Sequence, residues 1–242
     1  MKGFEERKYR HLTNPRGLVS FRVAVQETDL LVMAEKALRR ETREAVVRHR
    51  HAIETYLVTH PLFRESLIPL EDDPLAPKIV REMVQASQKC GVGPMAGVAG
   101  AIAYFVGEDL RIHSPEVIVE NGGDIYMKSS KKRRVAIYGG PSPLSLKIGI
   151  VIPAERTPIG VCTSSGTVGH SRSFGKADAV CIVSESPTLA DTAATAVGNR
   201  VKSRKDIEQG LARAREIEGV LGAVIVVGDG LGVWGEVKLV KI

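Results

Sequence analysis

Few cysteines and few aromatic residues narrow what this sequence can encode. Its 242 residues include three cysteines, Cys90, Cys162 and Cys181, which lie far apart and form no C-x-x-C pair. This spacing argues against a disulfide framework and against a zinc site. Aromatic residues make up 5% of the chain, too few to indicate the stacking platforms with which proteins bind single-stranded nucleic acid.

A long hydrophobic run is also missing, although hydrophobic residues make up 43% of the chain. No apolar stretch approaches the roughly 18 residues that a transmembrane helix needs. The charged segment from Met1 to Arg10 is not followed by the apolar core of a signal peptide. We therefore expect a cytoplasmic protein that does not bind membranes. Its length allows a single domain over residues 1–242, large enough to bury a core without disulfide bonds.

Positive charge is in excess, with 34 Lys and Arg against 28 Asp and Glu, a net charge of +6. Such a balance suits an anionic partner. The densest basic run, Lys128 to Arg134, lies between two strand-like segments and is interpreted as a solvated turn. We expect no nucleic-acid binding, and the phosphates of a small-molecule nucleotide are the favoured anion.

The expected elements mix hairpins with helices and lack a steady strand–helix alternation, which favours an α+β fold. Alternating polarity predicts a strand over 20–26, and a helical pattern covers 28–59, ended by Pro61. A second helix is expected over 78–90 and a last one from Ser203 to about Ile217. Further strands are expected at 116–120, 125–127, 135–138, 146–152, 159–163 and 179–184, with a C-terminal hairpin of 223–227 and 233–240.

A glycine-rich segment runs from Gly91 to Ala103 into a helix of small residues. Pro94 suits the first helical turn, and the free N–H groups and dipole of a helix start favour phosphate. The same composition also permits close helix packing, through Ala96, Gly97, Gly100 and Ala101. Both interpretations need the glycines.

Two helical residues, Asp191 and Thr195, place a carboxylate and a hydroxyl four positions apart, hence on one face. Two oxygen ligands on one face suit a hard cation such as Mg²⁺. An alternative is that Thr188 and Asp191 form a capping box that only stabilises the helix start.

Cys162 also has two interpretations. It could be a nucleophile beside the polar loop that starts at Thr163, or a small buried residue of a strand. The turn Asn121-Gly-Gly-Asp124 reads as a hairpin turn.

Five segments, in order over roughly residues 20 to 200, resemble the ApbE-like proteins, a superfamily that includes magnesium-dependent flavin transferases. These enzymes cleave FAD and attach FMN to a Thr or Ser of a partner flavoprotein. The matching segments are Gly97-Val-Ala-Gly-Ala-Ile-Ala, Glu120-Asn-Gly-Gly-Asp-Ile, Lys147-Ile-Gly-Ile-Val-Ile-Pro153, Thr163-Ser-Ser-Gly-Thr and Leu189-Ala-Asp-Thr-Ala-Ala-Thr-Ala.

The resemblance implies an ApbE-like mixed sheet with helices packed on it, and a role for particular residues. Asp191, Thr195 and the backbone carbonyl of Gly97 would bind Mg²⁺. The residues implied to approach the flavin nucleotide are Gly122, Gly123, Asp124, Thr163, Ser164, Ser165, Gly166 and Thr167.

The chain departs from the transferases at two places. Their helix start carries a Lys where this chain has Gly100, and their His-x-x-Asp-Pro-x-Thr-Gly segment is missing. His170 is the candidate to replace its histidine as a general base. With these departures, the chain resembles an uncharacterised branch of the superfamily, found mostly in anaerobic microbes. That branch has been associated with sulfide assimilation into homocysteine.

The sequence therefore leaves two functions open. The first is a Mg²⁺-dependent FAD-binding protein acting as a FAD:protein FMN transferase, with a flavoprotein acceptor, or as an FAD pyrophosphatase. The alternative is an accessory protein of sulfur and homocysteine metabolism that binds another nucleotide or metabolite without transfer. Either could form a homo-oligomer.

Overall fold

A computed structural model describes residue 10, residues 17–165 and residues 175–242 of the chain. Its main feature is an eight-stranded sheet in the order β1-β2-β3-β4-β7-β8-β9-β10, with every neighbouring pair antiparallel. The strands are β1 (Val19–Val25), β2 (Thr28–Ala34), β3 (Val117–Asn121), β4 (Asp124–Lys128), β7 (Ile159–Ser164), β8 (Ala179–Ser184), β9 (Val220–Val227) and β10 (Gly230–Gly235).

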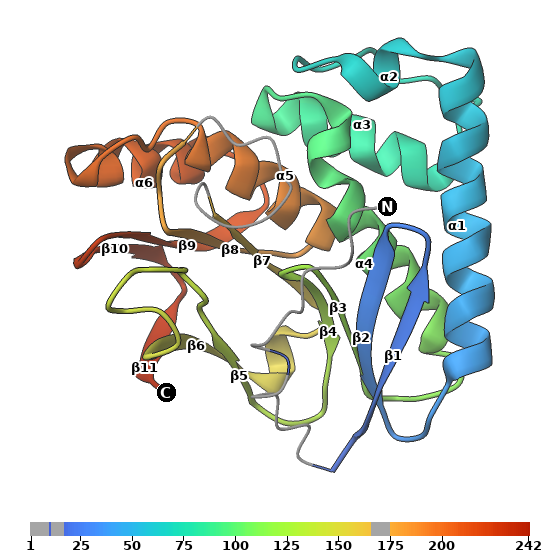
Figure 1. The fold of residues 1–242 in the computed structure, drawn as a ribbon, viewed down its shortest axis with the longest axis horizontal. Coiled ribbons are helices and arrows are strands. Elements are labelled where there is room, and N and C mark those ends of the chain that lie inside the picture. Colours follow the sequence, from blue (N-terminus) through green and yellow to red (C-terminus); the bar gives the residue numbers. More distant parts are fainter. Residues whose placement is uncertain (1–9, 11–16, 166–174) are drawn as a thin grey trace.

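Helices cover one face of this sheet and a smaller sheet, in the order β11-β6-β5, covers part of the other (Figure 1). Its strands are β5 (Arg133–Ala136), β6 (Ile148–Ile152) and β11 (Lys238–Lys241). The helices are α1 (Arg39–Thr59), α2 (Leu62–Glu65), α3 (Lys78–Cys90), α4 (Val98–Leu110), α5 (Pro187–Gly198) and α6 (Ile207–Glu216), with the short 3-10 turns η2 (Pro94–Gly97), η3 (Ala154–Arg156) and η4 (Arg204–Asp206). The expected α+β fold is confirmed.

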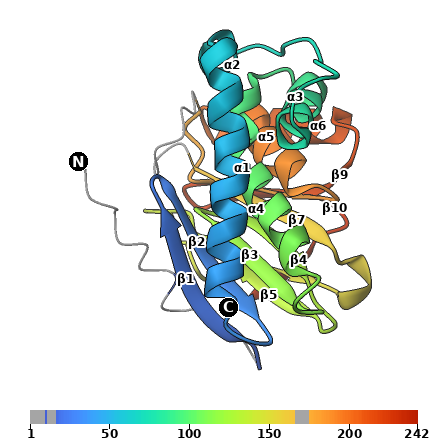
Figure 2. The same ribbon diagram turned by 90° about the vertical axis from the view of Figure 1, so that its right-hand side faces the viewer.

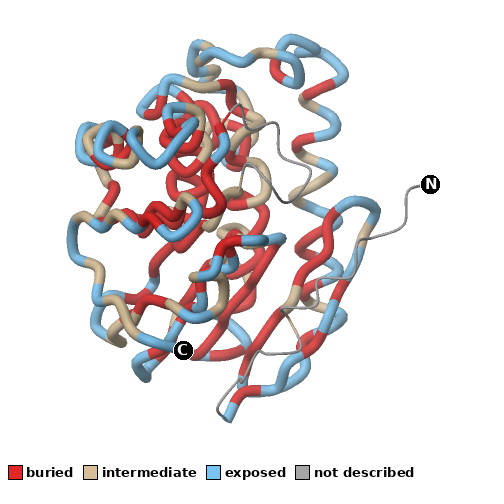
Figure 3. The backbone as a smooth tube through the Cα atoms, turned by 60° about the vertical axis from the view of Figure 1, so that its left-hand side comes forward, coloured by how far each residue is buried: buried red, intermediate tan, exposed pale blue. Residues whose placement is uncertain are grey.

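The hydrophobic core follows these layers. Apolar residues of β1 to β4 pack under α1, α3 and α4, and those of β7 to β9 pack under α5 and α6. A third cluster fills the space between the two sheets. Figure 2 shows α1 lying along the first strands, and Figure 3 shows the buried segments concentrated in the interior.

The helix expected over 28–59 is wrong in its first part. Residues Thr28–Ala34 form β2, which pairs with β1 from Val25 opposite Thr28 onward, and the helix begins at Arg39. Leu30, Val32 and Ala34 are fully buried. The sequence did not indicate a strand here because both faces of the segment are largely buried. Its apolar run therefore lacks the alternation of a half-exposed strand.

Other local signals held. The helix over 78–90 is confirmed, and Gly91 follows it in the left-handed conformation at φ 72°. This is the common glycine stop of a helix. The last helix is confirmed as well: Ser203 and Asp206 form a capping box before α6.

Two expectations about the second sheet are wrong. The C-terminal strand expected over 233–240 splits, because β10 ends at Gly235 and β11 crosses to pair with β6. The basic run is not entirely solvated either. The Arg133 side chain is buried and its Nη2 pairs with a Glu116 oxygen at 2.8 Å.

No single helix within the described ranges is long and apolar enough to cross a membrane. By length and composition alone, the bent pair of Lys78–Cys90 with Pro94–Leu110 would pass the same test.

Candidate functional site

The glycine-rich start of α4 lies directly against α5. A Cβ atom at Gly97 would come within 2.4 Å of the Thr192 hydroxyl oxygen, and one at Gly100 within 2.4 Å of the Pro187 carbonyl oxygen. Real Cβ atoms do not approach so closely, so both positions require glycine. The close-packing interpretation of the glycines is therefore correct. Position 100 also has no room for the lysine that the family resemblance would place there.

This contact brings Asp191 of α5 to the first turn of α4. The Oδ2 atom of Asp191 accepts a hydrogen bond from the backbone N–H of Gly100 at 2.8 Å. The capping box of Thr188 and Asp191 is wrong, because α5 is capped by Ser186, whose hydroxyl accepts from the N–H of Leu189. Asp191 therefore points at another element, where an anionic oxygen meets the positive end of the α4 dipole.

Two strands bring further donor atoms to Asp191. Asp124, the first residue of β4, lies opposite Cys162 of β7. The N–H of Thr163 bonds to the carbonyl of Gly123 in the preceding pair. Asp124 and Cys162 are thus a non-hydrogen-bonded pair, in which side chains lie closest. Oxygen atoms of Asp124 and Asp191 and the sulfur of Cys162 all lie within 4.8 Å of one another.

These groups are buried, which changes their proton affinity. Burial, followed by the negative charge of Asp124, raises the pKa of Asp191 well above its usual value, and the N–H groups of Gly100 and Ala99 offset only part of this. Burial, and then the same two carboxylates, raise the pKa of the Cys162 thiol well above its ordinary range. A thiol held protonated is a poor nucleophile, so the buried-core interpretation of Cys162 is the better one.

The donor set fits a divalent cation. Two carboxylates, a thiol and the backbone of a helix start converge from the four elements α5, β4, β7 and α4, and the two acids repel one another until a proton or a cation lies between them. The candidate ligand atoms lie within 4.8 Å of one another. This spacing is compatible with metal–ligand distances of about 2.0–2.3 Å around one ion. Thr195 lies one turn further along α5 and is half-buried.

The glycine turn between β3 and β4 adjoins this cluster. Gly122 and Gly123 have φ angles of 70° and 109°, which favour glycine. The N–H of Gly123 donates to an oxygen of Glu120 at 3.0 Å, and the Asn121 amide donates to the Ala99 carbonyl of α4 at 3.0 Å. The hairpin turn is confirmed, and it is attached to the same helix start as Asp191.

The remaining predicted residues divide into two groups. Thr163 and Ser164 end β7 and Ser165 follows it, all half-buried, and Thr163 bonds to the glycine turn. Gly166, Thr167 and His170 lie outside the described residues. Sequence reasoning missed the approach of Cys162 and Asp124 to Asp191, as well as the roles of Glu120 and Asn121. The strand register, once known, would have placed Asp124 opposite Cys162.

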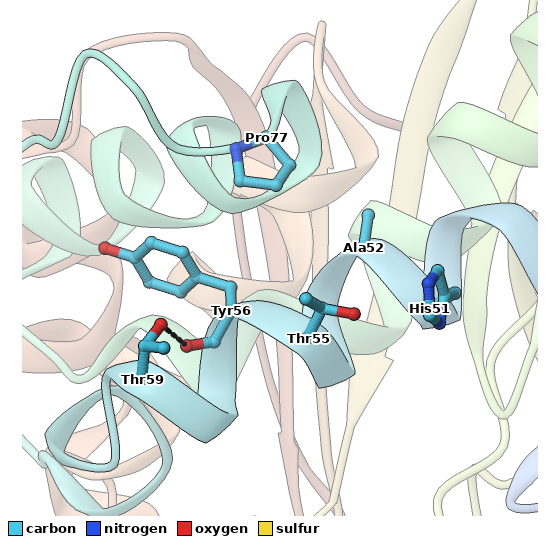
Figure 4. Close-up of a pocket in the computed structure, with 6 residues that line it drawn as sticks. All are labelled: His51, Ala52, Thr55, Tyr56, Thr59 and Pro77. Carbon is cyan, nitrogen blue, oxygen red and sulfur yellow. Dashed lines mark hydrogen bonds between the residues drawn. The ribbon is translucent and has the colours of Figure 1, made fainter.

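A separate surface hollow of about 330 Å³ lies between α1 and the start of α3 (Figure 4). Five of its residues come from one side of α1, and Pro77 closes the opposite side. None of its lining residues belongs to the predicted site. The residues are His51, Ala52, Thr55, Tyr56, Thr59 and Pro77.

Comparisons of the sequence with known proteins match nearly the whole chain. A family model described as AbpE bacteria matches residues 10–232. The UPF0280 protein of Methanosarcina acetivorans is 39% identical over 216 residues, covering 88% of this chain and 85% of its own length. That of Methanocaldococcus jannaschii is 38% identical over 227 residues, covering 91% and 92%.

Solved structures share the fold at low sequence identity. A mutant of the flavin transferase ApbE from Vibrio cholerae matches with a TM-score of 0.60 and 14% identity, over 90% of this chain and 97% of that one. The apo flavinyl transferase ApbE of Pseudomonas stutzeri matches with a TM-score of 0.58 and 16% identity, over 90% and 94%.

Proposed function

This chain belongs to the AbpE bacteria family, a branch of the ApbE-like superfamily, and we propose that it binds a flavin nucleotide beside a divalent cation. The observation that carries the proposal is the convergence of Asp124, Asp191 and Cys162 at the glycine-rich start of α4. Similar proteins of this fold are named flavin transferases. The flavin nucleotide of choice is FAD.

The cation would be held by oxygen atoms of Asp191 and Thr195, by the carbonyl of Gly97 and, on the strand side, by Asp124, with the sulfur of Cys162 beside them. Mg²⁺ is the first candidate, and when bound it would neutralise the diphosphate and act as a Lewis acid. The protein supplies the orientation. The N–H of Gly100 fixes one oxygen of Asp191, so the carboxylate cannot turn away from the cluster.

The nucleotide would lie along the Gly122–Gly123 turn and the segment from Thr163 to Thr167. The hydroxyls of Thr163, Ser164 and Ser165 line the described part of that segment. Glycine at position 122 leaves the backbone exposed, so a ligand can approach it without meeting a side chain. The net charge of +6 would favour an anionic nucleotide.

The reaction proposed is cleavage of the FAD diphosphate with release of AMP. The FMN phosphorus would pass either to a Thr or Ser hydroxyl of a flavoprotein acceptor or to water, and His170 would take the proton of the attacking hydroxyl. The family histidine segment is missing, which favours a second function: an accessory protein of sulfur metabolism that binds a nucleotide without cleaving it.

The deciding experiment is chromatography of FAD incubated with the protein and Mg²⁺. Release of AMP that is lost in His170→Ala supports the cleavage reaction, since a general base contributes a factor of about 10²–10⁴. Gln88→Ala, on the surface of α3, is a matched control. Binding of FAD without AMP, even with candidate acceptor proteins, would reject cleavage and leave the accessory function.

A further inference from the structure

The glycine turn of the site is attached to the N-terminal part of the chain by a buried ion-pair network. Glu120 accepts from the N–H of Gly123 through one carboxylate oxygen at 3.0 Å. Its other oxygen accepts from the Nε of Arg10 at 2.6 Å. The side chains of Arg10 and Glu120 are 11% and 8% exposed. A single carboxylate therefore connects Arg10 to the backbone of the turn.

Arg10 binds a second acidic residue at the same time. Its Nη1 donates to Oδ2 of Asp29 at 2.8 Å and its Nη2 to the Asp29 carbonyl at 2.8 Å. The Asp29 side chain is 3% exposed. Asp29 is on β2 and Glu120 on β3, so the guanidinium joins two neighbouring strands. The planar fork of arginine can serve three acceptors at fixed angles, which a lysine cannot do.

We propose that Arg10 is a positioning residue of the nucleotide site: by pairing with Glu120, it fixes the Gly122–Gly123 turn against which the nucleotide lies. The nucleotide part rests on the proposed function. Without Arg10, two buried carboxylates on adjacent strands lose their common cation, and Glu120 turns toward water to be solvated. Its hydrogen bond to Gly123 is then lost, and the turn moves.

The Gly122–Gly123 turn also positions the other segment proposed to contact the nucleotide, which begins at Thr163. The carbonyl of Gly123 accepts from the N–H of Thr163 at 3.1 Å. A Cβ at Gly123 would lie 2.9 Å from the Thr163 carbonyl. These two segments touch so closely that a shift in one displaces the other. Loss of Arg10 therefore affects both sides of the proposed nucleotide site, while leaving the Asp191 contact with Gly100 in place.

The first test measures FAD affinity by titration calorimetry for the wild-type chain, Arg10→Ala and Arg10→Lys. Arg10→Ala is expected to weaken FAD binding about tenfold, the usual contribution of a residue that holds a binding group in place. Arg10→Lys keeps the charge but not the fork, and should fall between. Binding of Mn²⁺ without nucleotide should weaken less than binding of FAD, because Arg10 acts on the turn and contacts none of the side chains of the metal cluster.

The matched control is Arg22→Ala. Arg22 pairs with the other oxygen of the same Asp29, at 2.6 Å, but its side chain is 55% exposed. Exposed ion pairs contribute little, so FAD affinity should stay within about twofold of wild type. A rescue variant, Arg10→Ala with Glu120→Gln, keeps an acceptor for Gly123 without a buried charge. It should recover most of the affinity that Arg10→Ala loses.

A second measurement does not depend on the ligand. Amide hydrogen exchange of Gly123, followed by NMR, should be about tenfold faster in Arg10→Ala than in Arg22→Ala, because its hydrogen bond opens more often. Unchanged exchange would overturn the inference. If the wild-type chain binds no FAD but the exchange rate changes, the proposed function fails and Arg10 positions the turn only. If Arg10→Ala and Arg22→Ala bind FAD with the same affinity, Arg10 does not position the nucleotide site.

Discussion

Asp191 on α5 accepts a hydrogen bond from the backbone N–H of Gly100, the third residue of α4, over 2.8 Å. N-cap side chains bond to the second or third N–H of their own helix, and here a neighbouring helix provides the cap. The same carboxylate lies within reach of Asp124 and Cys162. One residue is thus a structural cap and a candidate metal ligand, and substitutions can separate the two.

Replacing Asp191 with Asn should keep the cap and remove the metal ligand. The amide oxygen can still accept from Gly100, so at about pH 4, where the raised pKa keeps Asp191 protonated, the free energy of unfolding without metal should remain within about 1 kcal/mol of wild type, whereas Asp191→Ala should lose about 0.5–2 kcal/mol. Neither variant should be stabilised by Mg²⁺ or Mn²⁺. Thermal melts with cation or with EDTA measure both effects. A full cation effect in Asp191→Asn would contradict a ligand role for Asp191.

Stability without metal should depend on pH through Asp191. Burial and the charge of Asp124 raise its pKa above the ordinary 3.8, so the folded state holds a proton that the unfolded state has lost. Its contribution is complete below pH 3.8 and is lost as the pH rises toward the raised value. With EDTA present, wild type should lose stability relative to Asp191→Asn as the pH rises from about 4 to 8. Parallel profiles of melting temperature against pH would contradict the assignment.

Cys162 should be visible in the spectrum of a bound metal. If its sulfur is a ligand, Co²⁺ should produce a sulfur-to-cobalt charge-transfer band that Cys162→Ser lacks, and thiolate-compatible metals should bind more tightly than Mg²⁺. Cys181→Ser is the control, because Cys181 is equally buried but packs between the two sheets. A Co²⁺ complex of wild type without this band would place Cys162 outside the ligand set.

Gly100→Ala should destabilise the protein by about 1–3 kcal/mol, the usual cost of an added methyl group without space. Its Cβ would meet Asp191 Cβ at 2.8 Å and the Pro187 carbonyl oxygen at 2.4 Å. Gly139→Ala is the control, since its Cβ would have ordinary contacts at 3.6 Å. Urea unfolding measures both. Equal midpoints would mean that α4 and α5 do not pack as closely as described.

The sequence was sufficient where a local signal decides the structure. The helical pattern over residues 78–90 located α3, and the Asn121 to Asp124 turn located a hairpin. Local signals failed for Thr28–Ala34, whose burial on both faces depends on β1, on β3 and on the helices above them. They also failed at Arg133, because a distant Glu116 compensates its buried charge.

The candidate site was predictable only in part for the same reason. A motif singled out Asp191 and Thr195, but spacing alone could not distinguish a metal ligand from a capping residue. That distinction depends on Gly100, which another helix brings to Asp191. Likewise, Asp124 meets Cys162 through the register of β4 and β7. The ion pair of Arg10 with Glu120 joins residues that are 110 positions apart in the sequence.

Titration calorimetry of FAD with the wild-type chain, once with Mg²⁺ and once with EDTA, tests the central claim most directly. Because a cation at Asp191 would offset the charge of the diphosphate, FAD should bind more tightly with Mg²⁺, and the difference should vanish in Asp191→Asn. Equal affinity under both conditions, or no binding of FAD at all, would contradict a metal-dependent flavin nucleotide site in this protein.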